Sequence, residues 1–363
     1  MPNDNLTAAR LAKRDEFYTQ YYDIEKEVNA YLEYNPDVFR GKTVLLPCDD
    51  PEWSNFTRFF ALKFEELGLK KLISTSYAPN SKLIDETTDH SQEMEKGKIF
   101  ILEGDITGDG RIDIDDLKWE YLNGDGDFRS DEVKALRDEA DVIVTNPPFS
   151  LFREFLAWIV EAEKQFLIIG NMNAITYKET FPLIKENKIW LGESIHSGDR
   201  EFGVPDDYPL EAAGWRVDEN EYDECGRKKM YTKYIRVKGV RWFTNLEHGR
   251  RHQPLPLMTM ADNLKFSRHK DFKGKTGYDH YDNYDAIEVP YTELIPNDYD
   301  GIMGVPISFL DKYCPEQFEI LDARDYTNIE KLKNKNSYLI KDADGAINGK
   351  RTYVRILIRK KQS

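Results

Sequence analysis

Four short runs of aliphatic residues alternate with longer amphipathic stretches, and this alternation constrains the fold more than any other feature of the sequence. Buried strands are predicted at TVLLPC (43–48), KLISTS (71–76), DVIVTN (141–146) and QFLIIGN (165–171). Helices are predicted at 54–68, 130–140 and 151–164. Because strands that alternate with helices form a mostly parallel sheet covered on both faces, we predict an α/β fold that binds ligands beyond the carboxyl ends of its strands.

The alternation stops after the fourth of these strands. Two later strands, at 187–193 and 234–245, are predicted to form an antiparallel edge of the sheet. Beyond about residue 247 the sequence consists of short segments broken by Pro, Gly and Asp-Tyr clusters, which indicates a smaller second domain. We therefore predict domains at residues 1–246 and 247–363, with residues 98–124 inserted into the first domain as a hairpin.

The net charge of -15 argues against a protein that coats nucleic acid through its overall charge, because neutralised phosphates supply most non-specific affinity. The charge is uneven, however. Residues 225–252 contain nine Lys or Arg and one acid, so their local charge is 9 - 1 = +8. Aromatic residues are interleaved with these cations, which favours a contact surface for nucleic acid. The C-terminal tail is also basic, and for the tail a solvated face is an equal alternative.

Several classes of protein are disfavoured by the sequence. No apolar run approaches the roughly 18 residues of a membrane helix, and the start of the chain lacks the apolar stretch of a secretion signal, so a cytoplasmic location is expected. The three cysteines include no CxxC pair, which argues against a disulfide framework or a thiolate zinc site. Residues 105–116 match part of an EF-hand loop but lack its final Glu, and a polar turn without metal is preferred.

Asn146, Pro147, Pro148 and Phe149 follow the third predicted strand directly. Two consecutive prolines remove two backbone N–H donors, end the strand and hold an extended turn. The turn leaves the Asn146 side-chain oxygen and the Pro147 carbonyl as neighbouring acceptors, beside the flat ring of Phe149. This pattern indicates a receptor for a flat ring with an amino group, such as adenine. Two acceptors outside the ring plane would localise the amine lone pair, so that positioning and electrostatics activate it toward a methyl group.

With these residues in place, the chain resembles the EcoRI-type family of adenine-N6 DNA methyltransferases, which use S-adenosylmethionine. The resemblance is carried in family order by RDEFYTQYYDIE (14–25), CDDPEWSNF (48–56), TNPPFSLFREF (145–155), RWFTNLEHGRRH (241–252) and GVPISFLDKYCPEQFEI (304–320). It implies a Rossmann-like class I methyltransferase sheet and a smaller C-terminal DNA-recognition region. The implied reaction is methylation of the 6-amino group of a flipped-out adenine in double-stranded DNA.

The resemblance also implies which residues contact the cofactor: Phe17, Tyr18, Thr19, Asp49, Asp50, Pro51, Ser54, Asn55, Asp127 and Phe128. The family pattern Asp-Pro-x-x-Gly-x-Gly falls on residues 50–56, where Ser54 and Phe56 replace both glycines. Asp105 and Asp127 are both candidates for the acid that binds the cofactor adenine. We favour Asp127, because it lies one helix and one strand before Asn146. The contact to the cofactor ribose is not assigned.

A flipped base needs a second wall on which to stack, and the resemblance implies Trp242 or Phe243 for this role. Alternation along a strand sends the two side chains to opposite faces, so only one of them is expected to line the pocket. Three nearby arginines, Arg241, Arg250 and Arg251, are expected to contact DNA phosphates or base edges.

The family implies a monomer that modifies DNA for a restriction-modification system, with a cognate restriction endonuclease that forms no stable complex with it. Three other hypotheses stay open at this point. An RNA or protein-glutamine methyltransferase would share the Asn-Pro-Pro-Phe motif. A DNA-binding relative without catalysis would explain the replaced glycines, and a calcium-binding interaction module would explain residues 105–116.

Overall fold

The structure, a computed structural model, describes residues 17–52, 54–78, 96–104, 118–196, 198–204, 208, 214–220, 231–270, 272–322, 345–353 and 355–361. The EF-hand-like loop, Asp105 and the cations at 227–229 lie outside these ranges. The chain divides into two compact units, Met1–Met172 with Gly192–Glu247, and Asn173–Leu191 with His248–Ser363. The second unit therefore includes residues 173–191, which the sequence pattern assigned to the first domain.

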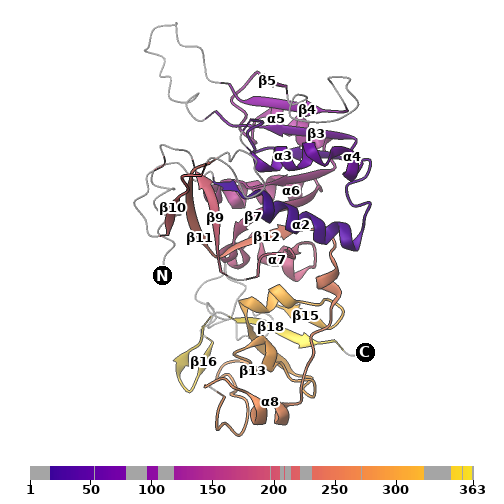
Figure 1. Cartoon of the computed structure of the whole chain (residues 1–363). Helices are drawn as coiled ribbons and strands as arrows, with labels where there is room; N and C mark the ends of the chain where they lie inside the picture. The colour runs from indigo at the N-terminus through magenta and orange to yellow at the C-terminus, as the bar shows by residue number, and fades with distance from the viewer. Residues whose placement is uncertain are drawn as a thin grey trace, which may run out of the picture. The chain divides into compact units, whose positions relative to one another are not determined.

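The first unit is built on a large mixed sheet whose strands follow the order β5-β4-β3-β2-β6-β7-β12 (Figure 1). Its parallel centre consists of the four predicted strands, observed as β2 (Thr43–Leu46), β3 (Lys71–Thr75), β6 (Val142–Thr145) and β7 (Gln165–Asn171). Antiparallel strands continue the sheet on both sides of this centre, as β4 (Lys98–Leu102) with β5 (Trp119–Tyr121), and as β12 (Val240–Thr244). The predicted α/β class is confirmed, and the antiparallel share is larger than the sequence indicated.

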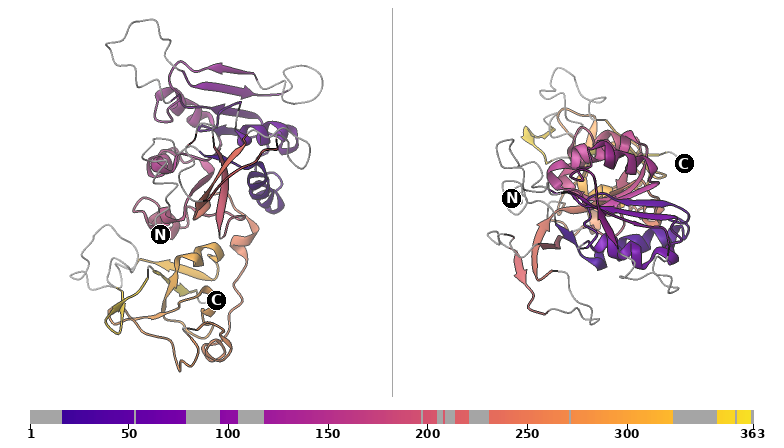
Figure 2. Two further views of the ribbon diagram at one scale, coloured as in Figure 1. Left: turned by 60° about the vertical axis from the view of Figure 1, so that its left-hand side comes forward. Right: turned by 90° about the horizontal axis from the view of Figure 1, so that it is seen from above.

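Helices cover both faces of this sheet (Figure 2, right). The indigo helices α2 (Tyr21–Tyr34), α3 (Asn55–Leu62) and α4 (Phe64–Leu67) lie on one face. The magenta helices α5 (Asp131–Glu139) and α6 (Phe152–Glu161) lie on the other, with a 3-10 turn, η3 (Phe149–Leu151), before α6. Serine N-caps start two of them, because Ser54 and Ser130 accept hydrogen bonds from the Phe56 and Val133 amides.

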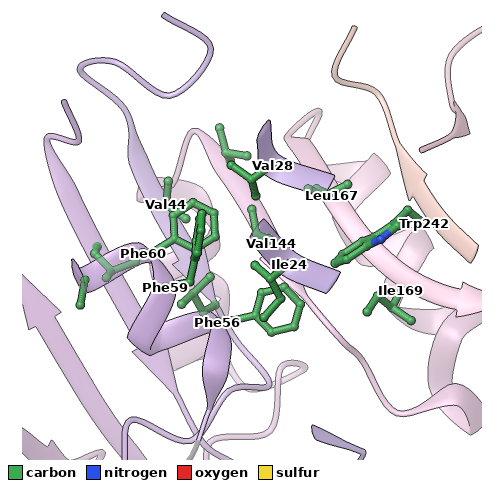
Figure 3. Packing of buried hydrophobic residues seen from close by; sticks show 14 of the residues in the cluster. Ile24, Val28, Val44, Phe56, Phe59, Phe60, Val144, Leu167, Ile169 and Trp242 are labelled. Carbon is green, nitrogen blue, oxygen red and sulfur yellow. The ribbon is translucent and has the colours of Figure 1, made fainter. Parts of the chain in front are cut away.

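The alternation of side chains along each strand divides the core into two layers. Figure 3 shows the layer beneath α2 and α3, where Val44, Val144, Leu167 and Trp242 of neighbouring strands meet the phenylalanines of α3. Residues with the opposite orientation face α6, as Phe243 does where its ring packs 5.0 Å from that of Phe152. Strand β12 is therefore covered on both faces, like the strands at the centre of the sheet.

A smaller antiparallel sheet completes the first unit. Its strands follow the order β1 (Tyr18–Thr19), β9 (Asp199–Val204), β11 (Lys233–Lys238) and β10 (Trp215–Val217). The predicted strand 234–245 is thus two strands in different sheets, with Gly239 between β11 and β12. Gly239 has φ = +70°, a backbone conformation that glycine adopts without strain and that ends the first strand there.

The second unit contains a four-stranded sheet in the order β13 (Ala286–Glu288), β14 (Ile302–Pro306), β18 (Arg355–Lys360) and β15 (Phe318–Leu321). It also contains α7 (Phe181–Lys185), α8 (Met260–Phe266), β8 (Trp190–Leu191), and the pair β16 (Ala346–Ile347) and β17 (Lys350–Arg351). Short 3-10 turns, η5 (Gly249–His252), η6 (Thr292–Leu294) and η7 (Ile307–Lys312), connect these elements. A buried ion pair between Glu288 and Arg355 ties β13 to β18 across the sheet.

The burial of Trp242 predicts a large loss of stability on truncation. Trp242→Ala should lower the free energy of unfolding by about 3–5 kcal/mol, because the side chain is 1% exposed and its removal leaves a cavity beneath α3. Trp215→Ala is the matched control, since Trp215 is 50% exposed on β10, and it should cost less than about 1 kcal/mol. Urea unfolding followed by circular dichroism measures both, and equal losses would contradict this account of the core.

Candidate active site

A cavity of about 240 Å³ opens in the first unit at the carboxyl ends of β2, β3 and β6. Five separate segments of the chain converge on it, which is the arrangement that parallel sheets favour for binding sites. Its lining residues are Phe17, Tyr18, Thr19, Pro47, Cys48, Asp49, Asp50, Ser54, Asn55, Ser76, Tyr77, Gly126, Asp127, Phe128, Arg129, Asn146, Pro148 and Leu151.

The buried carboxylate of Asp49 links several of these segments. Its two oxygens accept hydrogen bonds from the Ser54 hydroxyl at 2.7 Å and the Thr145 hydroxyl at 2.5 Å. The Asp49 backbone carbonyl accepts a third, from the Ser74 hydroxyl of β3 at 2.6 Å. Burial raises the pKa of Asp49 to about 7, although the two hydroxyl donors act in the opposite direction. The cavity therefore contains a carboxyl group that changes charge near neutral pH.

Ser54 shows how the loop after β2 forms without the first glycine of the family pattern. Its φ is -82°, an ordinary value for a residue with a side chain, so the loop path after β2 needs no glycine there. The Ser54 hydroxyl donates to Asp49 and also accepts from the Phe56 amide as the N-cap of α3. The substitution therefore adds a bond between the loop and the start of the helix.

The Asn146 side chain is held in one orientation at the end of β6. Its Nδ2 donates to the Phe17 carbonyl at 2.6 Å, which turns Oδ1 the other way. Oδ1 is buried and has no hydrogen-bond partner among the described residues. Since a buried acceptor without a donor is unfavourable, and since Asn146 lines the cavity, this oxygen is suited to receive a donor from a ligand.

The remaining residues of the Asn-Pro-Pro-Phe motif have different surroundings. Pro148 lines the cavity, whereas Pro147 is buried and is not among the lining residues. Phe149 is half-buried, and its ring meets those of Phe17 and Phe202 edge to face at 5.9 Å and 6.4 Å. Phe149 is also outside the lining set, so the motif contributes Asn146 and Pro148 directly and Phe149 through its packing on Phe17.

Two asparagine side chains hold the N-terminal strand beside the cavity. Asn146 donates to the Phe17 carbonyl, and Asn55 at the start of α3 donates to the Thr19 carbonyl at 2.8 Å. The Tyr18 ring stacks on that of Tyr231, with centroids 4.5 Å apart. The structure thus brings Phe17, Tyr18, Thr19 and Asn55 to the cavity that the sequence predicted for them.

The segment 126–129 forms another wall, and its acid is already engaged. The Asp127 carboxylate accepts hydrogen bonds from the backbone and side chain of Arg129, with the Nη2 contact at 2.8 Å. Gly126 has φ = +78°, and a Cβ there would lie 2.0 Å from the Ser76 carbonyl oxygen. The Phe128 ring packs against Phe155 behind the wall. Asp127 and Phe128 therefore both line the cavity, and their contact with the cofactor stays a prediction.

Several lining residues were not identified from the sequence. Cys48 follows β2, Ser76 and Tyr77 follow β3, and Arg129 follows Asp127. The rule that parallel strands bind ligands at their carboxyl ends would have found the first three, because Cys48 and Ser76 end predicted strands and Tyr77 follows one. Of the predicted cofactor contacts, Pro51 is buried and lies outside the lining set.

The prediction that Trp242 or Phe243 lines the pocket is wrong. Trp242 is 1% exposed and meets Phe56 of α3 edge to face, while Phe243 is fully buried against Phe152 of α6. Helices cover both faces of β12, so alternation along the strand directs each ring into a core layer. Neither is among the residues that line the cavity.

Two of the three predicted DNA-contacting arginines are also placed differently. Arg241 is buried and donates to the backbone carbonyls of Val240 and His196. Arg251 is buried in the second unit, where its guanidinium lies 3.6 Å from the centroid of the Trp190 ring. Side chains enclosed in this way cannot reach a phosphate, so these two predictions are wrong. Arg250 is half-buried and donates to the Asp311 carbonyl, and its DNA contact stays a prediction.

The helices of the described ranges are all too short or too polar to cross a membrane. Within the same ranges, no three His, Cys, Asp or Glu side chains are grouped as metal ligands would be.

Comparison with known proteins agrees with the geometry. The family model described as "Adenine-specific methyltransferase EcoRI" matches residues 5–361. The Type II methyltransferase M.EcoRI of Escherichia coli is 42% identical over 360 residues, which cover 99% of this chain and 97% of that protein. The Type II methyltransferase M.MpnI of Mycoplasma pneumoniae is 35% identical over 98% of each chain. No solved structure matches this chain. The chain therefore belongs to the EcoRI family of adenine-specific methyltransferases.

Proposed function

We propose that this protein transfers a methyl group from S-adenosylmethionine to the 6-amino group of an adenine in double-stranded DNA. The names of its relatives support a modification enzyme of a restriction-modification system, since M.EcoRI and M.MpnI are both Type II methyltransferases. The structural observation that carries the proposal is the buried Asn146 Oδ1, an acceptor without a protein donor beside a cavity. An adenine amine supplies the donor that this oxygen lacks.

The cavity suits the methyl donor by charge. Asp49, Asp50 and Asp127 contribute three carboxyl groups to its lining. Asp127 pairs with Arg129 and Asp50 with Lys98, whereas Asp49 forms no ion pair with a cation of the described chain. A ligand with a cationic amino group and a sulfonium is favoured in such surroundings. We assign its amino acid end to Asp49 and Asp50, and its adenine to Asp127 and Phe128. Bound there, S-adenosylmethionine supplies an electrophilic methyl carbon.

The residues of the protein then position the amine and stabilise the charge that develops on it. Asn146 Oδ1 and the Pro147 carbonyl accept the two amine hydrogens, and the amine lone pair is directed at the methyl carbon. A methyl group supplied by S-adenosylmethionine held at Asp49, Asp50 and Asp127 would bond to the amine nitrogen, on which positive charge would then develop. The amine then releases one proton to solvent. The two acceptors stabilise the charge that develops on nitrogen, and this electrostatic term is the main contribution of the protein.

An adenine inside a duplex must leave the stack to reach this site. We propose that Phe149 presents one face to the extruded base, as its half-buried ring next to Phe17 allows. The second wall is not Trp242 or Phe243, since both are enclosed in the core. Tyr18 and Tyr77 are aromatic residues that do line the cavity, and they are the candidates that replace them.

The proposal also covers the fold type, the role of the second unit, and the location and oligomeric state of the enzyme. The parallel centre of the sheet, with helices on both faces, supports a Rossmann-like class I methyltransferase arrangement. The smaller second unit is proposed to recognise the DNA sequence. The enzyme is proposed to act in the cytoplasm as a monomer, because one methyl transfer needs one site, alongside a separate restriction endonuclease.

A labelling experiment tests the function directly. Genomic DNA, total RNA and a protein extract are each incubated with the enzyme and S-adenosylmethionine that carries a tritiated methyl group. We expect the label in DNA, as N6-methyladenine at one short sequence motif that single-molecule sequencing identifies. Label confined to RNA or protein would contradict the proposal and favour the alternative substrates.

Replacement of Asn146 tests the catalytic role of its side-chain oxygen, Oδ1. Asn146→Ala should lower kcat by about two orders of magnitude or more, because the acceptor acts on the amine as its charge develops. The Kd for S-adenosylmethionine, measured by calorimetry, should change less than about threefold. A near-wild-type kcat would contradict the role. Asn55→Ala is the control, since Asn55 also holds the N-terminal strand, through the Thr19 carbonyl, but is not assigned to the amine. It should retain a much larger share of kcat.

The raised pKa of Asp49 predicts that cofactor binding depends on pH. The carboxyl is mostly protonated below its pKa of about 7 and ionised above it. Because the ionised form attracts a cation, the Kd for S-adenosylmethionine should fall by up to about tenfold between pH 6 and pH 8. Asp49→Asn should bind more weakly at pH 8 and lose most of this dependence. Calorimetry at several pH values measures both, and an unchanged pH profile in the variant would exclude Asp49 as its source.

A further inference from the structure

The second unit carries a basic segment that the site and its cofactor do not use. Residues 264–275, LKFSRHKDFKGK, contain five Lys or Arg and one acid, so their local charge is 5 - 1 = +4 in a chain whose net charge is -15. The segment comprises the end of α8 and the turns that follow it (Figure 1). We call the four exposed cations Lys265, Arg268, Lys270 and Lys273 the basic cluster.

The cations of this cluster are solvent-exposed and lie outside the ion pairs of the described chain. All four side chains are exposed, and no carboxylate of the described chain forms an ion pair with any of them. Phe266 lies among them and is 58% exposed, with the Lys265 ammonium 5.0 Å from its ring centroid. Exposed cations interleaved with an exposed aromatic are typical of nucleic-acid contact surfaces.

The backbone beneath the cluster is firmly anchored. Phe272 is buried, and its ring meets Tyr278 edge to face at 4.9 Å. His269 stacks on Tyr291 with centroids 3.7 Å apart, and it contacts the Glu293 carboxylate at 2.8 Å. The amides of Phe272 and Lys273 both donate to the His269 carbonyl, which closes the turn. Alternate side chains are therefore fixed inward while Arg268, Lys270 and Lys273 point outward, an arrangement that reduces the entropy lost on binding.

Several other cations of the second unit, by contrast, are neutralised by acids. Lys188 pairs with Glu186 at 2.8 Å, Arg359 with Glu319 at 2.6 Å, and Lys275, at the end of the segment itself, with Asp279. The long-range attraction of a paired cation for a polyanion is largely cancelled by its partner. The basic cluster is therefore a more effective site for phosphates than the arginines at 241 and 251, which are buried.

We propose that Lys265, Arg268, Lys270 and Lys273 bind the phosphate backbone of duplex DNA and hold the second unit on the substrate. The inference rests on the proposed function, because it takes the DNA duplex to be the polyanion. Each Lys or Arg that neutralises a phosphate releases counterions, which adds about 0.9 to the steepness of log K against log salt. At 0.15 M salt this corresponds to about fivefold in affinity for each contact.

The test compares salt-dependent DNA binding of the wild type and of a variant with all four cations replaced by Gln. Fluorescence anisotropy measures the Kd for a fluorescein-labelled 30-base-pair duplex in about 0.05–0.3 M KCl. We expect the variant to bind about a hundredfold or more weakly at 0.15 M, with a salt slope about 3 to 4 less steep. An unchanged Kd and slope would overturn the proposal. Weaker binding with an unchanged slope would overturn it as well, since the loss would then not come from phosphate contacts.

Single substitutions provide the matched control and guard against misfolding. Lys270→Gln should weaken binding about fivefold and reduce the slope by about 0.9, whereas Lys188→Gln should leave both unchanged, because Glu186 already neutralises that lysine. Equal effects of the two substitutions would contradict the proposal. Calorimetry with S-adenosylmethionine verifies that each variant is folded.

Methylation of DNA by the wild type, measured in the same preparations, separates this inference from the proposed function. If the wild type methylates DNA and the four-site variant binds normally, only the basic cluster is rejected. If the wild type does not methylate DNA, the proposed function itself fails.

Discussion

The carboxylate of Asp49 is the interaction on which the site depends, because it joins segments that are far apart in the sequence. Through Thr145 it ties the end of β2 to the end of β6, and through Ser54 it fixes the start of α3. Asn146 follows Thr145 directly, so the same bond sets the position of the proposed catalytic amide. A buried carboxyl is costly unless its oxygens are hydrogen-bonded, and here both are. Burial still raises the pKa of Asp49. A cationic ligand in the cavity can compensate for the cost of ionising this buried carboxyl.

The sequence predicted the elements whose patterns are local. The four central strands are continuous apolar runs, and Asp49 and Asn146 were placed at the site because each follows such a run and parallel strands end at one edge. The roles of Trp242 and Phe243 could not be derived in this way. A strand of alternating large residues at a sheet edge would expose one face, but β12 pairs with β7 beneath helices on both sides, and only the three-dimensional arrangement reveals this.

Charge counts along the sequence misplaced Arg241 and Arg251 for a related reason. The segment 225–252 has a local charge of +8, yet Arg241 donates to backbone carbonyls and Arg251 lies over Trp190. A guanidinium can be held inside a protein by carbonyl oxygens and an aromatic face, so sequence charge does not report accessible charge. The segment 264–275, with a local charge of only +4, carries exposed cations because its inward positions are taken by Phe272 and His269. The division of residues 173–191 from the first unit is likewise a matter of packing that no local pattern encodes.

An acidic protein that methylates DNA has to bind two ligands of opposite charge. On our proposal its methyl donor is cationic, and the cavity offers it the carboxyl group of Asp49, which forms no ion pair with a described cation, beside the paired acids Asp50 and Asp127. Its DNA substrate is a polyanion, and on our proposal the basic cluster attracts it with four cations that no described carboxylate neutralises. Because salt screens charges beyond about 8 Å at physiological ionic strength, each region acts mainly on the ligand groups that lie close to it. The net charge of -15 therefore says little about DNA binding, since the local field at each surface governs which ligand it attracts.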